Sequence, residues 1–268
     1  MSTETNTKVK GYGIVLGVLT LALQHGVYLL SHHISSRLGL DPFSPKTAID
    51  DLIPLVPAFI IPYVWSYVYW AMAPMAVSKC EKSHFLKYMS AYVLSMLLGA
   101  TVLIFVPTYM DRVAEGLQNP DMHGFGVRLM QFWYSLDGGD MAYNLLPSFH
   151  CVNSTISYLG VARRPEIPKW YRVYSLVLTL LIYASTLFVK QHFLPDVFAG
   201  IAVALISWGI VSALWKRRKA VSAYWSRRGW SLHCGTAGVS SLLKLYPVAL
   251  ATFWGKLFSG RYKVSRCG

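Results

Sequence analysis

The sequence has little charge, and acidic residues are the scarcest of all. Only 12 of the 268 residues are Asp or Glu, and charged residues together make up 14% of the chain. A soluble domain carries about 25% charged residues, whereas 54% of this chain is hydrophobic. A soluble fold is therefore excluded, and we expect an integral membrane protein. We see no polar block large enough to fold separately, so we predict one membrane domain, residues 1–215, and a basic tail, residues 216–268.

Cysteine is scarce as well. None of the cysteines forms a Cys-x-x-Cys pair or lies near a His at zinc spacing; they are Cys80, Cys151, Cys234 and Cys267. We therefore expect no disulfide framework, no metal site and no cofactor. The stretch Asp137-Gly138-Gly139-Asp140 has two carboxylates, but glycine supplies positive φ at little cost, so a turn is predicted there instead.

Long apolar stretches are abundant. A membrane-spanning helix needs about 20 largely apolar residues. Six stretches are predicted to span: Tyr12–Leu30, Ile53–Val77, Tyr88–Pro107, His150–Val161, Trp170–Val189 and Val197–Trp215. The first follows ten polar residues and is too long for the core of a signal peptide, so we expect it to be retained. The predicted fold class is all-α, a polytopic bundle of six transmembrane helices with a basic cytoplasmic C-terminal tail.

Two of these predicted spans are unusual. The span His150–Val161 is short and polar, so it belongs inside the bundle, where its hydroxyl groups can find partners. The span Ile53–Val77 is predicted to kink because it contains Pro54, Pro57, Pro62 and Pro74. In the tail, the stretch Ser241–Phe258 separates apolar from polar residues at helical spacing, which predicts a helix lying in the membrane interface.

Basic residues are divided unevenly among the connections. Lys and Arg dominate the N-terminus, the second-to-third and fourth-to-fifth connections and the start of the tail, whereas the other connections balance them with Asp and Glu. This bias places both termini in the cytoplasm, which an even number of spans allows. The net charge of +13 suits contact with anionic membrane lipids better than nucleic-acid binding. We expect a plasma-membrane protein.

Ionisable side chains occur at the ends of several predicted spans. With the orientation above, His150, His192, Asp196 and Arg112 all fall at the outer membrane face. Ionisable groups at membrane depth are costly and suggest a functional site by default. These four residues come from distant parts of the chain, so their common position favours a shared site.

The residue types at this face suit phosphoryl transfer. His192 and Asp196 are spaced i, i+4, a contact distance on a helix. A carboxylate bonded to one imidazole nitrogen fixes the tautomer and leaves the other nitrogen free to attack. His150 could act as the general acid, while Ser148 and Lys190 offer a hydroxyl group and a cation to an oxyanion. The set predicts transfer through a phosphohistidine.

Two stretches of the sequence resemble signatures of a known family. Pro147-Ser148-Phe149-His150 resembles the second signature, Pro-Ser-Gly-His, of the type 2 phosphatidic acid phosphatase superfamily. The stretch Ser185–Asp196 resembles the third signature: Ser-Arg, five residues, His, three residues, Asp. The six-span architecture also matches the membrane branch of that superfamily.

The resemblance implies roles for individual residues. It implies that His192 is the nucleophile, that Asp196 orients it and that His150 is the acid. It also implies that Ser148 binds phosphate and that no metal is required.

The sequence departs from the family pattern at three places. Arg112 is the only candidate for the first signature, with Phe105 where a Lys should stand. The Arg of the third signature is replaced by Thr186, and the Gly of the second by Phe149. Lys190, four residues after Thr186, lies on the same helical face and could compensate. The expected phosphate-binding residues are therefore Ser148, Lys190 and Arg112.

The predicted function is hydrolysis of a lipid phosphate or prenyl diphosphate at the outer membrane face. The alternative is a lipid phosphotransferase. Asp50–Pro54, Pro62-Tyr63 and the occurrence of Thr186 with Lys190 in place of the signature Arg resemble the inositol-phosphoceramide and sphingomyelin synthase-like subgroup. A second alternative is a non-catalytic protein that binds or transports lipid. The expected partners are a lipid phosphate or diphosphate and membrane lipids, with no nucleic acid.

Overall fold

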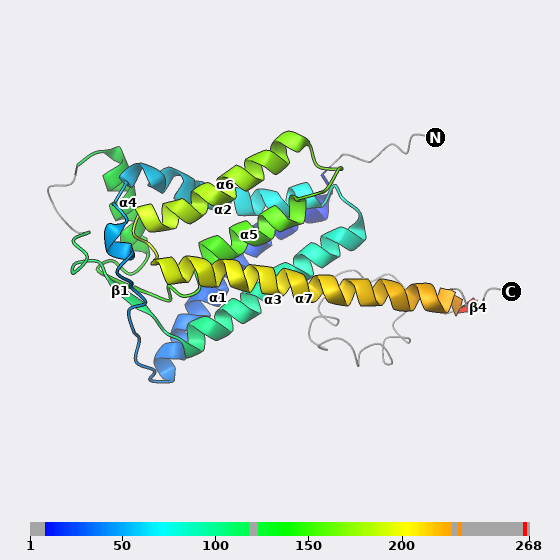
Figure 1. The fold of residues 1–268 in the computed structure, drawn as a ribbon, viewed down its shortest axis with the longest axis horizontal. Coiled ribbons are helices and arrows are strands. Elements are labelled where there is room, and N and C mark those ends of the chain that lie inside the picture. The colour runs from blue at the N-terminus through cyan, green and yellow to red at the C-terminus, as the bar shows by residue number, and fades with distance from the viewer. Residues whose placement is uncertain (1–8, 118–122, 227–229, 232–264, 267–268) are drawn as a thin grey trace. The chain divides into compact units, whose positions relative to one another are not determined.

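The computed structural model describes residues 9–117, 123–226, 230–231 and 265–266, and it is mostly helical (Figure 1). The helices in this part of the chain are α1 (Gly11–Arg37), α2 (Ile60–Val77), α3 (Lys82–Phe105), α4 (Phe125–Leu136), α5 (Phe149–Val161), α6 (Lys169–Phe188) and α7 (Leu194–Ser226). The chain divides into two compact units, Met1–Gly209 and Ile210–Gly268. The smaller unit contains the end of α7 and the short pair β3 (Trp230–Ser231) and β4 (Ser265–Arg266).

Within the described part of the chain, four helices are long and apolar enough to cross a membrane. They are α1, α3, α6 and the part of α7 from Leu194 to Arg218. The mostly helical class of a membrane protein is therefore confirmed. The other two predicted spans correspond to α2, with 18 residues, and α5, with 13. The count of six spans stays a prediction, and the predicted interfacial helix Ser241–Phe258 lies outside the described residues.

Helix α2 begins later than predicted because of its prolines. Pro57 opens a short 3₁₀ turn, Pro57–Phe59, and Pro54 precedes it, so neither proline lies inside the helix. Pro62 lies in the first turn of α2, where a missing N–H breaks no intrahelical hydrogen bond. Only Pro74 lies in the helix interior.

Helix α5 lies at the centre of the helices, as its polarity predicted (Figure 1). All but two of its 13 residues are buried. Its polar side chains find partners on three neighbours: Ser154 accepts a hydrogen bond from Trp70 of α2, Asn153 donates to Gln24 of α1, and Thr155 bonds Tyr183 of α6. Buried hydroxyl and amide groups are costly unless they are hydrogen-bonded, so this short helix depends on its neighbours.

The connection between α3 and α5 contains structure that the sequence did not predict. Strands β1 (Tyr109–Asp111) and β2 (Met141–Tyr143) pair antiparallel, with Met110 opposite Ala142. Helix α4 lies between them and buries Val127, Met130 and Tyr134, which recur at helical spacing. The predicted turn Asp137–Asp140 is confirmed, with φ of 85° and 65° at its two glycines. Helix α4 and β1 lie at the end where α6 ends and α7 begins (Figure 1).

Candidate active site

The connection between α6 and α7 carries His192. Helix α6 ends at Phe188, and Lys190 turns the chain in the left-handed region with φ of 48°. The N–H groups of Gln191 and His192 both donate to the carbonyl of Thr186, at 3.0 and 3.1 Å. Such bonds close the C-terminal end of a helix. Helix α7 then begins at Leu194, with Pro195 in its first turn, where proline is tolerated.

The structure brings His192 and Asp196 together. His192 Nδ1 lies 3.4 Å from Asp196 Oδ2, and the Asp196 side chain is completely buried. The same Oδ2 accepts a hydrogen bond of 2.8 Å from the Phe193 N–H. Neither His192 Nδ1 nor Asp196 Oδ1 has a well-aligned hydrogen-bond partner within the described part of the chain. The carboxylate therefore faces the imidazole at slightly more than hydrogen-bond distance.

His150 lies opposite this pair, in the first turn of α5. Its ring centroid is 6.1 Å from that of His192. Tyr63 stacks on His150 at 4.1 Å, and the Trp70 ring meets it edge-on at 4.9 Å. The His150 Nε2 atom is buried without a hydrogen-bond partner among the described residues. Aromatic rings thus fix the orientation of this imidazole, and Nε2 is not engaged by a described protein group.

Ser148 joins the two motifs. It is the N-cap of α5, and its Oγ accepts a weak hydrogen bond of 3.4 Å from the Cys151 N–H, as a capping serine does. Its backbone N–H donates to the carbonyl oxygen of Asp196 at 3.0 Å. The start of α5 and the start of α7 are therefore held in register, which fixes His150 relative to Asp196.

The two candidate cations both lie near this connection. Lys190 Nζ donates to the carbonyl oxygen of Asp50 at 2.7 Å. Burial lowers the pKa of Lys190 from its usual value, and the negative charge of Asp50 opposes that shift. Arg112 is fully buried and lies beneath the loop that carries His192. Its NH2 group bonds Gln191 Oε1 at 2.7 Å and Asp137 Oδ2 at 2.9 Å.

The remaining donors of Arg112 are also occupied by the protein. Its NH1 group donates to the carbonyl oxygens of Asp137, at 2.9 Å, Gly139, at 2.6 Å, and Tyr134, at 3.3 Å. The guanidinium lies 4.5 Å from the centroid of the Tyr134 ring. Only Nε lacks a partner among the residues that the structure describes. Arg112 therefore links the Asp137–Asp140 turn to the residue before His192.

Asp50, which the sequence offered only as part of the Asp50–Pro54 stretch and not as a site residue, contacts the segment that carries His192. It is buried, and its Oδ2 accepts bonds from the N–H and hydroxyl of Thr47. Its Oδ1 accepts a bond of 2.7 Å from the N–H of Leu194, the first residue of α7. Together with its carbonyl bond to Lys190, Asp50 thus positions both ends of the segment that carries His192. Its place in an acid-poor chain, just before the proline-rich start of α2, is a signal that could have drawn attention to it.

A family model described as the PAP2 superfamily matches residues 32–210, two thirds of the chain, and the match includes both signature stretches and Arg112. The chain belongs to the PAP2 superfamily. This is the type 2 phosphatidic acid phosphatase superfamily, whose members are generally phosphatases and phosphotransferases. Neither the curated proteins nor the solved structures gave a significant match.

One departure from the PAP2 pattern has a structural explanation. Phe149 stands where the second signature has Gly, and its ring fills the space beside Gly99 of α3. A Cβ at Gly99 would collide with the Phe149 ring. The Phe149 side chain, which a glycine at that position would not have, thus fits because residue 99 of the neighbouring helix α3 is glycine. His150 therefore still lies in the first turn of α5.

The other departures concern the cations of PAP2 proteins. Thr186, at the place of the signature Arg, is buried, and its hydroxyl donates to the carbonyl oxygen of Tyr183. Lys190 projects from the turn after the helix instead. The expectation that Lys190 lies on the same helical face as Thr186 is therefore wrong, because α6 ends at Phe188 and Lys190 has a left-handed backbone.

Proposed function

We propose that this PAP2 protein is a membrane enzyme that hydrolyses a lipid phosphate or prenyl diphosphate through a phosphohistidine at the outer membrane face. The observation that carries the proposal is the placement of the buried Asp196 carboxylate against Nδ1 of His192, with His150 opposite. A carboxylate at Nδ1 makes the other nitrogen, Nε2, the more nucleophilic.

The first step forms the phosphoenzyme. Nε2 of His192 attacks phosphorus, the P–N bond forms, and the P–O bond to the lipid breaks. His150 gives a proton from Nε2 to the departing lipid oxygen. Asp196 stabilises the positive charge that develops on His192. The Asp196 carboxylate does not have to move to do so, because it already accepts a hydrogen bond from the Phe193 N–H.

The second step regenerates the enzyme. Neutral His150 accepts a proton from water while the water oxygen attacks phosphorus, and the P–N bond breaks with its electrons returning to His192. Acid and base roles thus alternate on one residue, as microscopic reversibility requires. Because the nucleophile is an imidazole, we expect turnover to continue in excess chelator.

The phosphoryl oxygens need positive charge during both steps. Lys190 supplies it by exchanging its bond to the Asp50 carbonyl for one to phosphate, and the Ser148 hydroxyl adds a further donor. Arg112 was predicted to bind phosphate too. Its donors are bound by Asp137, Gln191 and three carbonyl oxygens, which supports a positioning role through Gln191.

Head-group transfer to a lipid alcohol is the second candidate function. The burial of His150 under Tyr63 and Trp70 favours it, because an enclosed acid–base residue limits the access of water to the phosphoenzyme. Water and alcohol attack the same intermediate, so the residues have the same roles in both reactions.

The test is incubation of the purified full chain with a panel of labelled lipid phosphates, with and without lipid alcohols. We expect release of labelled phosphate from the wild type, an acid-labile phosphoenzyme that chases into product, and neither in His192→Ala. Label that moves to the lipid alcohol and not to water identifies the transferase. A wild-type enzyme that turns over a lipid with no labelled intermediate, or a His192→Ala variant that retains activity, contradicts the mechanism.

A further inference from the structure

Helix α4 carries an exposed apolar stripe. Phe125, Phe132 and Leu136 are 76%, 56% and 64% exposed, and Leu129 is partly buried. These four residues recur at intervals of three or four positions, so they share one side of the helix. Single exposed apolar residues are normal, but a contiguous set of them marks a surface that another molecule covers.

The other sides of α4 differ from this stripe. One side is buried in the fold, as described above. Another side is polar and carries Arg128, Gln131 and Ser135, of which Arg128 and Ser135 are exposed. A helix with Phe and Leu on one exposed side and a basic, polar side next to it has the pattern of a helix that lies in the membrane interface.

Helix α4 lies where a spanning helix ends. Its 12 residues extend about 18 Å, too short for a hydrocarbon core of about 30 Å. A Cβ at Gly126 would lie 3.1 Å from the Pro57 carbonyl oxygen, so α4 lies against the turn that Pro57 opens. The ring of Phe59, which ends that turn, is 4.7 Å from the ring of Phe188, the last residue of α6. Because α6 is long and apolar enough to cross a membrane, α4 lies at the depth where that helix reaches the membrane surface (Figure 1).

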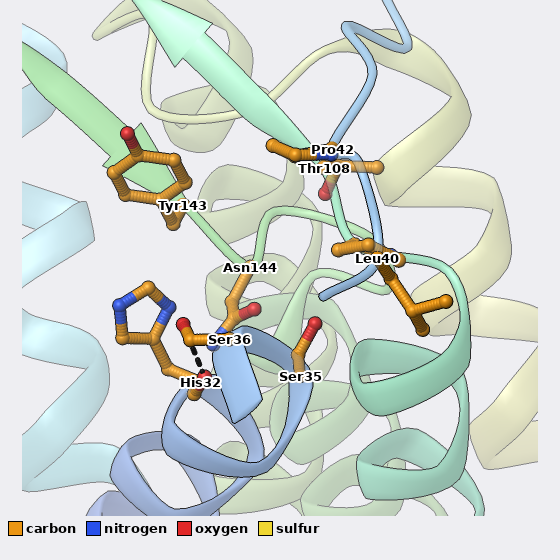
Figure 2. Close-up of a pocket in the computed structure, with 9 residues that line it drawn as sticks. His32, Ser35, Ser36, Leu40, Pro42, Thr108, Tyr143 and Asn144 are labelled. Carbon is orange, nitrogen blue, oxygen red and sulfur yellow. Dashed lines mark hydrogen bonds between the residues drawn. The ribbon is translucent and has the colours of Figure 1, made fainter. Parts of the chain in front are cut away.

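The stripe is separate from the pocket that Figure 2 shows. That pocket lies between the end of α1, the segment that follows it and the β1–β2 pair. None of the nine residues drawn around it belongs to α4, and Ser35, Ser36 and Asn144 give it a polar lining. The apolar side of α4 is therefore not the rim of this pocket and has an occupant of its own.

Trp133 connects the stripe to the candidate active site. Its ring centroid lies 6.4 Å from that of Phe132 in the stripe and 6.4 Å from that of Tyr63. Tyr63 in turn stacks on His150 at 4.1 Å. A series of ring contacts thus leads from the exposed side of α4 to His150, so the stripe and the site lie at the same end of the fold.

Hydrocarbon chains fit the stripe better than a second copy of the protein does. The stripe exposes roughly 400 Å², if each large side chain presents about 200 Å² when fully exposed. A stable protein interface buries about 800 Å² on each partner. Helix α6, next to the stripe, also exposes apolar residues such as Leu180 and Leu181, and those of a spanning helix face lipid. The same leaflet can therefore cover both surfaces.

We propose that α4 lies in the membrane interface beside the candidate site and that its stripe contacts the hydrocarbon chains of the lipids in that leaflet. The helix buries its apolar stripe about 5–10 Å below the head groups and turns Arg128 and Ser135 toward water. This surface is distinct from the proposed function and does not depend on it.

The test measures the depth of each side of α4 in the membrane. The purified full chain, in a background without the native cysteines, is labelled with a nitroxide at Phe132→Cys or Ser135→Cys and reconstituted in vesicles of phosphatidylcholine and phosphatidylglycerol. Ser135→Cys is the matched control on the polar side, and Leu180→Cys on α6 is the reference for lipid contact. Spin relaxation reports collisions with oxygen, which concentrates in hydrocarbon, and with a nickel chelate, which stays in water. Leu136→Cys and Arg128→Cys repeat the comparison if the first pair misfolds.

We expect the Phe132→Cys label to collide with oxygen more than with nickel, as the Leu180→Cys label does, and to lie about 5–10 Å below the head groups. The Ser135→Cys label should collide mainly with nickel. Equal ratios of the two collision rates at positions 132 and 135 overturn the interfacial position. Low access of both reagents to Phe132→Cys, with spin–spin broadening that grows with the protein-to-lipid ratio, assigns the stripe to a second copy and also overturns it. No lipid is turned over in this experiment, so failure of the proposed hydrolysis leaves its result unchanged.

Discussion

Asp196 is completely buried, and His192 is the side chain in ionic contact with it. Burying a carboxylate is costly unless hydrogen bonds and an opposite charge compensate it. The Phe193 N–H and the position of Asp196 in the first turn of α7 supply part of that compensation. A protonated or phosphorylated His192 supplies the rest. The carboxylate is therefore best satisfied when His192 carries positive charge, which is the state that the phosphoenzyme mechanism requires.

The first prediction tests that dependence. Asp196→Asn keeps the shape and removes the charge, so it should lower kcat by about 10²–10⁴-fold with little change in KM. The corresponding change in a serine protease costs about 10⁴-fold. Phosphoenzyme formation in single-turnover experiments is the measurement. A variant that loses substrate binding but forms phosphoenzyme at the normal rate would contradict the orienting role.

The second prediction concerns the pH dependence of Lys190. Burial lowers its pKa, and Asp50, Asp51 and Glu115 oppose that shift while Lys46 adds to it. If the cation binds the phosphoryl oxygens, kcat/KM, which reports the free enzyme, should fall as pH rises through a pKa below the usual value of about 10.4. Lys190→Arg should abolish this fall, because Arg keeps its charge.

The effect of pH on folding stability can be measured separately from its effect on turnover. Between the folded and unfolded pKa values of Lys190, the unfolded chain binds more protons, so deprotonation of this residue makes the fold more stable as pH rises. The melting temperature recorded over the same pH range serves as the control. An alkaline fall in kcat/KM that persists unchanged in Lys190→Arg assigns the titration to another group.

The candidate catalytic residues could be predicted from the sequence, and the residues that position them could not. His150, His192, Asp196 and Ser148 stand at fixed motif spacings, and the structure gathers them. Asp50 acts on the site through bonds to backbone groups of a segment that lies more than 130 residues away. Bonds to backbone groups leave no pattern in side-chain identity, so no spacing in the sequence could indicate them.

At the scale of elements, the connection between α6 and α7 is held by neighbours on several sides. The Val56 N–H donates to the Phe188 carbonyl, the Tyr134 hydroxyl donates to the Val189 carbonyl at 2.6 Å, and Arg112 bonds Gln191. Two of these contacts come from the region between α3 and α5 that was predicted to be a loop. Its 12-residue helix α4 is too short to span a membrane, so span length does not indicate it, although Val127, Met130 and Tyr134 follow the helical period.

The third prediction tests whether α4 positions His192. Tyr134→Phe removes the bond to the Val189 carbonyl and keeps the ring that contacts Arg112. We expect kcat to fall about 10–10²-fold, because small displacements of a reacting group are costly, with KM nearly unchanged. Tyr92→Phe is the matched control, since it removes a buried hydroxyl that donates to the Thr20 carbonyl at 2.9 Å between α1 and α3. Equal losses of kcat in the two variants at equal melting temperature would show that α4 only stabilises the fold.

At the scale of the whole larger unit, the two ends of α5 differ in chemistry. His150 at its N-terminal end belongs to the candidate site. At its other end, the Gly160 carbonyl bonds His84, and basic residues such as Arg163 and Arg164 follow. Thirteen helical residues rise about 1.5 Å each, so the two ends are about 20 Å apart. This separation agrees with a site at one membrane face and a basic face opposite.

The last prediction tests that orientation. We would introduce a single cysteine at either Val113 or Arg163, one for each face. Val113 follows the buried Arg112 and is 57% exposed, and Arg163 is also exposed. The background replaces the native cysteines, of which Cys80 and Cys151 are buried. The positive-inside rule places the basic face in the cytoplasm. An impermeant maleimide should therefore label Val113→Cys in sealed cells and Arg163→Cys only after permeabilisation. The reverse pattern would place the site on the cytoplasmic side, where His192 would meet lipid phosphates of the inner leaflet instead.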